Sequence, residues 1–171
     1  MSEIVKTLFD ICLLRKGPED LSCDTTLMLV LIGVSLVVSF WLGLMIHDLQ
    51  IAGLSSVAGL FFSFVFTKML LLKKPERFTQ TFCAMLGTVT LINLLSVPVI
   101  YPLTKEGLDG SLVTIFGLLS FALFIWIVIV YGFIFSRAIS SLLGYGVAIS
   151  VCYALLSIII LELFLATRVV N

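Results

Sequence analysis

The sequence is poor in charge and in the side chains that do most enzyme chemistry. Charged residues make up 12% of its 171 residues, against about 25% in an ordinary soluble domain. Lys plus Arg and Asp plus Glu number ten each, so the formal net charge is zero and no basic excess attracts nucleic acid. These shortages argue against an ordinary soluble domain and against a nucleic-acid-binding protein.

Catalytic and metal-binding motifs are also missing. The chain has one His, its four Cys form no Cys-x-x-Cys pair, and no phosphate-binding glycine loop or nucleophile elbow occurs. Gly144-Tyr145-Gly146 is a lone glycine pair inside an apolar segment. We therefore expect a non-enzymatic protein with no cofactor and no metal site.

Apolar residues dominate what is present, at 61% of the chain. The charges gather in short stretches, and long uncharged tracts lie between them. A helix needs about 20 apolar residues to cross the roughly 30 Å hydrocarbon core of a bilayer. The sequence therefore predicts an all-α polytopic transmembrane bundle, in a domain over residues 25–168. Its five predicted spans cover residues 25–46, 51–72, 78–100, 111–135 and 141–165.

Four breaks separate these spans. Residues 47–50 form a tight hairpin, and residues 73–77 contain Pro75, which can open the next helix. Residues 102–110 form the longest loop between spans. The weakest break surrounds Arg137, where a turn is needed because the last two spans would otherwise merge into one helix too long for any bilayer.

The distribution of Lys and Arg predicts the orientation, since cytoplasmic loops are enriched in these residues. With the N-terminus in the cytoplasm, eight of the ten lie on or near the cytoplasmic side, and only Lys105 and Arg168 lie outside. We therefore expect a cytoplasmic N-terminus and an outside tail at residues 169–171, in a membrane that is the bacterial inner membrane by the resemblance below.

Residues 1–24 precede the first span and do not resemble a cleavable signal peptide, because a mixed-charge tract and then a full-length span follow their apolar stretch. Apolar residues recur there at helical spacing, at Ile4, Leu8 and Cys12 among others. This pattern is typical of a short amphipathic interfacial helix. Two alternatives stay open: the helix lies on the lipid surface, or it caps the bundle.

Few ionisable groups fall near the membrane interior, where such groups are functional candidates. Glu162 lies about one turn from the end of the fifth span, and His47 and Asp48 lie in the first hairpin. Together they would make a polar membrane site only if the fifth helix packs against this hairpin. The alternative is an interfacial carboxylate, paired with His47 or Arg168, and an ordinary turn.

The third span is the most polar, with Thr81, Thr88, Asn93 and Ser96 among its residues. Such groups either form hydrogen bonds across helix interfaces or line a narrow pathway. Asn93 and Glu162 are the residues that a pathway would use.

Small residues recur at every fourth position in two spans, a pattern that allows helix backbones to approach closely. These predicted packing positions are Ser55, Gly59 and Ser63 in the second span, and Gly144, Ala148 and Cys152 in the fifth. The pattern serves the fold, a homo-oligomer or a partner subunit. The cysteines fall in the cytoplasm or the inner half of the membrane, so we expect no disulfide.

Two stretches resemble a known group of proteins: residues 13–21 (LLRKGPEDL) and residues 75–81 (PERFTQT), continuing to Ala84, Gly87 and Thr88. They are similar to small proteobacterial inner-membrane proteins with the five-helix layout of the Yip type. The resemblance implies a cytoplasmic N-terminal tract, five spans and an outside C-terminus, and it implies no known chemistry.

Two functions are compatible with these features. The first is an accessory subunit, assembly factor or scaffold of a membrane complex, which binds the lipid bilayer and other membrane subunits or a second copy of itself. The second is a small transporter or channel that acts as an oligomer, with the third helix and Glu162 lining its pathway.

Overall fold

Six α-helices and two short 3₁₀ helices form the computed structural model, which describes residues 2–22, 24–105 and 109–169, with side chains described from 3 to 162 outside those gaps. This part of the chain contains no β-strand. The elements in chain order are α1 (Ser2–Cys12), η1 (Pro18–Asp20), α2 (Thr25–Ile46), α3 (Leu49–Leu70), η2 (Pro75–Arg77), α4 (Phe78–Leu103), α5 (Gly110–Ile139) and α6 (Leu143–Val169). Within the described residues, five helices, α2 to α6, are long and apolar enough to cross a membrane, which confirms the all-α prediction of five such helices.

The helices begin and end close to the predicted positions, and the differences have local causes. The carboxylate of Asp24 accepts a hydrogen bond from the backbone N–H of Leu27 at 2.8 Å, which caps α2 at its predicted start. Helix α5 continues past Arg137 to Ile139 and ends where Ser140 adopts the left-handed conformation (φ 58°). Arg137 does not end the helix, because a charged residue by itself does not interrupt helical backbone. The left-handed backbone conformation of Ser140 ends it.

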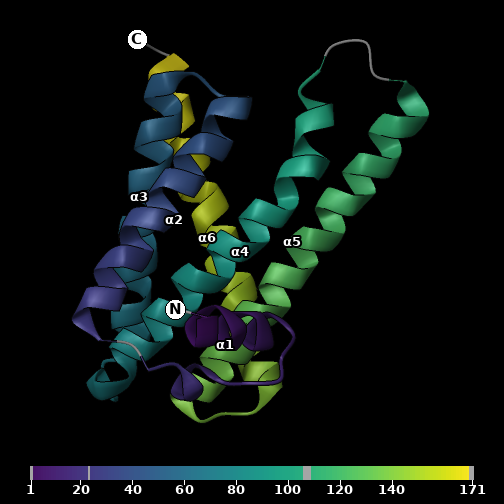
Figure 1. The fold of residues 1–171 in the computed structure, drawn as a ribbon. Coiled ribbons are helices and arrows are strands. Elements are labelled where there is room, and N and C mark those ends of the chain that lie inside the picture. The colour runs from purple at the N-terminus through teal and green to yellow at the C-terminus, as the bar shows by residue number, and fades with distance from the viewer. Residues whose placement is uncertain (1, 23, 106–108, 170–171) are drawn as a thin grey trace.

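The long helices form two arms that join at one end of the molecule (Figure 1). Helices α2, α3 and α6 make one arm, and α4 and α5 make the other. The arms meet where the α3–α4 turn and the α5–α6 turn lie, and this end is called the base. At the far end the α4–α5 pair runs away from the other three helices.

Helix α4 is the centre of the bundle at the base. Half of the residues in its most apolar stretch are buried inside the protein, whereas only 6% of the residues in the corresponding stretch of α5 are buried. Phe82 and Met85 of α4 are fully buried, as are Ile134 and Phe135 of α5. The burial of α4 follows from its contacts with α1, α2, α3 and α5.

Helix α1 lies across α4 and α5 near the base (Figure 1) and packs on them through one face. Leu8 and Ile11 are buried in the core, and the Leu8 side chain occupies the space that Gly87 leaves on α4. The indole Nε1 of Trp126 donates a hydrogen bond to the carbonyl of Cys12 at 3.0 Å, which ties the end of α1 to α5. Of the two alternatives for this helix, the structure therefore shows packing on the bundle, while Phe9 on the opposite face stays 45% exposed.

The cysteines differ in state. Cys12 and Cys152 are free thiols, whereas Cys83, fully buried in α4, is disulfide-bonded. The expectation of no disulfide is therefore wrong. It assumed that a cytoplasmic location keeps thiols reduced.

Candidate functional site at the base

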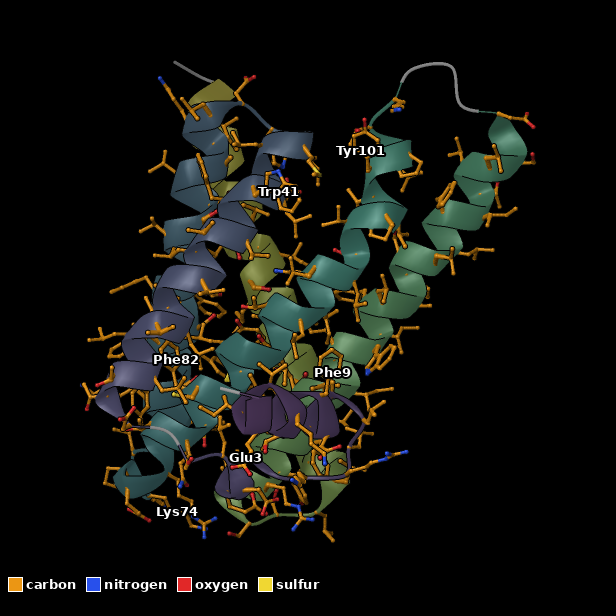
Figure 2. All side chains as sticks on the ribbon, viewed as in Figure 1. Glu3, Phe9, Trp41, Lys74, Phe82 and Tyr101 are labelled. Atoms are coloured by element: carbon orange, nitrogen blue, oxygen red, sulfur yellow. The ribbon has the colours of Figure 1, made fainter. Side chains whose placement is uncertain are left out.

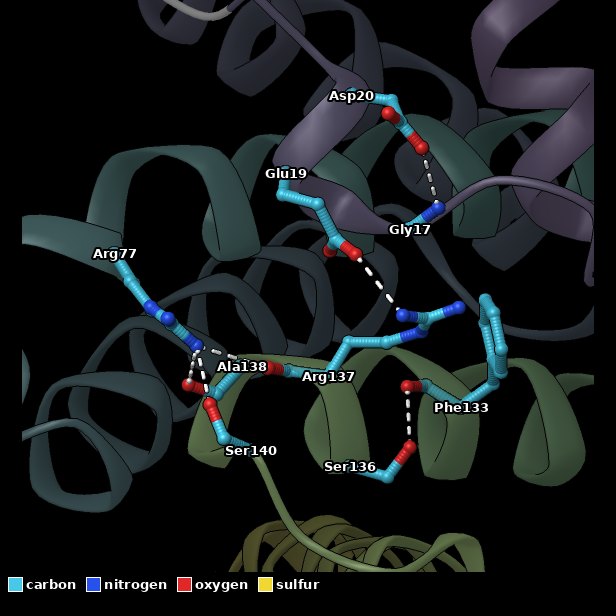
Figure 3. A network of polar contacts seen from close by, with 9 residues as sticks. All are labelled: Gly17, Glu19, Asp20, Arg77, Phe133, Ser136, Arg137, Ala138 and Ser140. Carbon is cyan, nitrogen blue, oxygen red and sulfur yellow. Dashed lines mark hydrogen bonds and ion pairs between the residues drawn. The ribbon is translucent and has the colours of Figure 1, made fainter.

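A network of polar contacts made by charged side chains lies at the base, where η2 meets the end of α5 (Figure 3). The Arg77 Nη1 donates to the carbonyls of Arg137 at 3.1 Å and Ala138 at 3.2 Å, and to the Ser140 hydroxyl at 2.7 Å. The Lys74 Nζ donates to the Ile139 carbonyl at 3.0 Å and to the same hydroxyl at 2.9 Å. Carbonyls at a helix C-terminus lack partners within the helix and bear partial negative charge, so these two cations stabilise the end of α5.

Local sequence places these cations. Pro75 opens η2, as expected from its fixed φ, and this turn brings Lys74 and Arg77 to the same side. The left-handed residue Ser140 turns the chain so that its hydroxyl faces both of them. The predicted break at Arg137 is therefore a turn that side chains from another loop hold in place.

A second ion pair closes the other side of this region. Arg137 on α5 lies 3.4 Å from a carboxylate oxygen of Glu19 on η1. The backbone N–H of Gly17 donates to the Asp20 carboxylate at 2.9 Å, which fixes the turn that presents Glu19. Both partners of the ion pair are about half exposed, so solvent screens it and its contribution to stability is at most about 1 kcal/mol.

Glu19, Arg77, Arg137 and Ser140 are among the residues that line a cavity of about 850 Å³, called the basal pocket. Arg77 and Arg137 contribute two positive charges to its lining, and Glu19 and Glu76 contribute two negative charges. Gln80 and Thr81 of α4 add polar groups, and Pro18, Phe133 and Leu143 add apolar walls. The pocket therefore combines charges of both signs with an apolar side.

A second cavity, of about 180 Å³, lies inside the bundle between its helices and is called the hydroxyl cavity. Ser35 and Ser39 of α2, Ser55 and Ser56 of α3, and two tyrosines line it. One of them, Tyr153 on α6, forms a 2.6 Å hydrogen bond with Ser63 on α3. A cavity of this size with several hydroxyls can hold water, but it contains no acid, base or cation to do chemistry.

The residues of the predicted polar membrane site lie at the α2–α3 turn and on α6. His47 ends α2 and is half-buried, Asp48 is exposed before α3, and Glu162 is exposed on α6. No group of three or more His, Cys, Asp or Glu able to hold a metal exists among the described residues. Asn93 is half-buried on α4, and neither Asn93 nor Glu162 lines the hydroxyl cavity. The side chain of Arg168, the other predicted partner of Glu162, lies outside the described residues.

The hydroxyls of α4 bond to its own backbone. Thr81, Thr88 and Thr90 each donate to the carbonyl four residues earlier, at 2.7–2.8 Å, and Ser96 donates to Asn93 at 2.7 Å. These groups therefore need neither a partner helix nor a pathway to satisfy them. Among the described side chains, Ser120 on α5 has the one buried oxygen without a hydrogen-bond partner.

The two small-residue stripes differ in what they face. On α3, Ser63 is buried and bonded to Tyr153 of α6. Ser55 and Gly59 line both the hydroxyl cavity and a further cavity, of about 210 Å³, against α6. On α6, Gly144, Ala148 and Cys152 are exposed, and a methyl group added at Gly144 would meet nothing within 4 Å. The stripe on α6 is therefore not a packing surface within this chain.

Sequence inspection missed the residues that join α5 to α6. A methyl group at Gly146 would collide with the backbone oxygen of Gly132 and with Ser136, so two glycines allow the helices to touch backbone to backbone. Gly146 was visible only as part of a weak glycine pair, and Gly132 belonged to no small-residue stripe in its span. Their pairing depends on the turn at Ser140, which sets the register of the two helices.

Comparison with known proteins gives no family: no protein-family model, curated protein or solved structure matches the chain. The class that the structure itself defines is an all-α bundle with five helices, within the described residues, that are long and apolar enough to cross a membrane. Five such helices indicate an integral membrane protein.

Proposed function

We propose that this protein is a non-enzymatic integral membrane protein that acts as an accessory subunit, assembly factor or scaffold in a membrane complex. The observation that supports this proposal most is the far half of α5. Helix α5 buries side chains only from Val130 onward, and its preceding part presents large apolar side chains such as Leu118 (65% exposed) and Phe121 (61% exposed). In a bilayer this arm offers a long surface to lipid or to another membrane helix (Figure 2).

The polar groups support a binding role over catalysis. The hydroxyls of α4 bond to its own carbonyls, and the charged groups of the base stabilise a helix end. No set of nucleophile and base follows from these contacts. The Yip-type resemblance rests on short motifs and layout, and it is compatible with such a role.

We place the base in the cytoplasm, in a bacterial inner membrane, because Lys73, Lys74, Arg77 and Arg137 all lie there. The disulfide at Cys83 favours the opposite orientation, with the base outside, since disulfides persist mainly in oxidising compartments. We give greater weight to the basic residues, because Cys83 is fully buried and so is shielded from cellular reductants.

Photo-crosslinking in living cells tests the accessory role. A photoreactive residue at Leu118 on α5 is expected to capture a distinct protein band, whereas the same residue at Phe61 on α3, 68% exposed, serves as the matched lipid-facing control. Capture of lipid alone from Leu118, together with solute flux in vesicles that contain only this protein, contradicts the proposal and favours the transporter.

Small-molecule transport remains the second candidate because of the hydroxyl cavity inside the bundle. The pathway would then run through Ser35, Ser39 and Ser63 instead of through Asn93 and Glu162. Flux that falls when Ser39 is replaced by Leu, and not when Glu162 is replaced by Gln, would support this route.

A further inference from the structure

The basal pocket has the composition of a ligand site. Its volume of about 850 Å³ lies within the range of about 300–1,000 Å³ typical of small-molecule sites. Its lining contains two guanidinium groups, from Arg77 and Arg137, and two carboxylates, from Glu19 and Glu76. A ligand that uses all four charges needs an anionic group and a cationic group within one small molecule.

The two arginines are available to a ligand in different degrees. Arg77 is half-buried, and its Nη1 is engaged with the end of α5. A guanidinium has five N–H donors, so Nε and Nη2 remain for a further acceptor. Arg137 is 55% exposed and touches Glu19 only at 3.4 Å, a long contact for such a pair. Planar guanidinium groups bind phosphate oxygens in a bidentate way.

The location of the pocket indicates that such a ligand comes from the membrane. Its lining comes from η1, from η2 and the start of α4, and from the α5–α6 turn, and so it lies at the ends of the membrane-spanning helices. In a bilayer these ends lie at the level of the lipid headgroups. Phe133, Leu143 and Pro18 form an apolar side that suits the glycerol and the upper acyl chain of a lipid.

We propose that the basal pocket binds a zwitterionic aminophospholipid headgroup, with its phosphate between Arg77 and Arg137 and its ammonium group at Glu19 and Glu76. This assignment rests on the membrane placement proposed above and needs no partner protein. An anionic headgroup without an amine would leave both carboxylates facing its negative charge, and free phosphate would leave them equally uncompensated. The carboxylates therefore determine the specificity.

Binding of soluble short-chain lipids to the purified full-length protein, in an uncharged detergent, tests this proposal by calorimetry. The probes are dihexanoyl-phosphatidylethanolamine, dihexanoyl-phosphatidylglycerol and inorganic phosphate. We expect the ethanolamine lipid to bind at least about tenfold more tightly than the glycerol lipid, because charge-assisted hydrogen bonds to both carboxylates are lost in the latter. Inorganic phosphate is expected to bind most weakly.

Two substitutions are expected to change the affinity for the glycerol lipid in opposite directions. A loss of stability alone cannot produce this result. Arg137→Gln is expected to weaken binding of both lipids by about tenfold. Glu19→Gln is expected to weaken the ethanolamine lipid and to strengthen the glycerol lipid, because it removes a negative charge that opposes the latter. Lys73→Gln is the matched control: this exposed residue precedes η2 and does not line the pocket, so its loss should leave both affinities unchanged.

Three results of the lipid measurements would overturn the proposal. They are equal affinity for the two lipids, no effect of Glu19→Gln on their ratio, or an effect of Lys73→Gln as large as that of Arg137→Gln. Tighter binding of inorganic phosphate than of either lipid would also overturn it and would assign the pocket to a free anion. Because the assay contains no other protein, failure of the accessory role leaves its outcome unaffected.

Discussion

Two glycines on α6, two residues apart, have different roles. Gly146 contacts the backbone of Gly132 directly, whereas Gly144 faces open space. The small-residue pattern in the sequence selected Gly144, because it lies four residues from Ala148. The pattern identifies a helix that can pack closely, but only the three-dimensional register decides which small residue is the one in contact.

This difference predicts that Gly146→Ala destabilises the α5–α6 pair by about 1–3 kcal/mol, since the added methyl group meets backbone that cannot move aside. Gly144→Ala is the control, and we expect it to be neutral or slightly stabilising, because Ala favours helix over Gly by about 1 kcal/mol. Thermal unfolding in detergent measures both. Equal behaviour of the two variants would show that the backbone contact is absent.

A further residue-scale prediction concerns Cys12, whose thiol lies outside the five long helices. Burial raises the pKa of this thiol from 9.0 to about 11. Its alkylation rate, followed by mass spectrometry of the peptide, should therefore rise with a midpoint near pH 11 in the native protein and near 9 after denaturation. The folded state favours the neutral thiol, so stability from this group is complete below pH 9 and is lost as the pH rises through 11. A native midpoint near 9 would contradict the burial of Cys12.

At the scale of single elements, α1 is the helix whose surroundings could not be predicted from the sequence. Its helical spacing of apolar residues predicted an amphipathic helix but gave no partner for it, because a lipid surface and a protein surface select the same pattern. The structure shows that Gly87 on α4 leaves the space for Leu8. No feature of the sequence linked these two residues, which lie in segments far apart in the chain.

We predict that Ile11→Ala undocks α1, because Ile11 is fully buried and truncation of such a side chain costs about 2–5 kcal/mol. Phe9→Ala, on the exposed face, is the control. Trypsin cleavage after Arg15 and Lys16 reports docking, and we expect it to accelerate at least about tenfold in Ile11→Ala alone. An equal acceleration in Phe9→Ala would indicate that lipid or detergent contact, and not the bundle, holds α1.

The long helices were easier to predict than the contacts between them. Uninterrupted apolar segments, separated by charged or Pro-containing breaks, determine where a membrane helix begins and ends, and so the five predicted segments lie close to α2–α6. The basal pocket was not predicted, because Glu19 lies in the tract before the first span, whereas Arg77 and Arg137 belong to two separate breaks. Each break marked a helix end, and no pattern indicated that the three would meet.

At the scale of the whole molecule, the orientation is open to direct test. Reporter fusions are expected to be active in the cytoplasm when placed after Lys73 or Ser141, and outside when placed after Asp48. Reversing the charge bias, by replacing Lys73, Lys74 and Arg77 with Gln and adding Lys residues beside Asp48, should produce molecules of mixed orientation. Reporters that place the base of the wild-type protein outside would reverse the assignment and agree with the disulfide at Cys83.

The way α4 satisfies its own hydroxyl groups has a consequence for biosynthesis. The helices of a growing chain enter the bilayer in order. Helix α4 therefore arrives before α5, which packs against it, and α6, which closes the bundle, have been made. Thr88 and Thr90 bond to carbonyls of α4 itself, and Thr81 bonds to the carbonyl of Arg77 just before it. Helix α4 therefore brings none of these hydroxyls unsatisfied into lipid before α5 and α6 are made. The bond between Ser63 of α3 and Tyr153 of α6 forms only when the last helix arrives. The most buried helix of the finished protein is thus also suited to a period alone in the membrane.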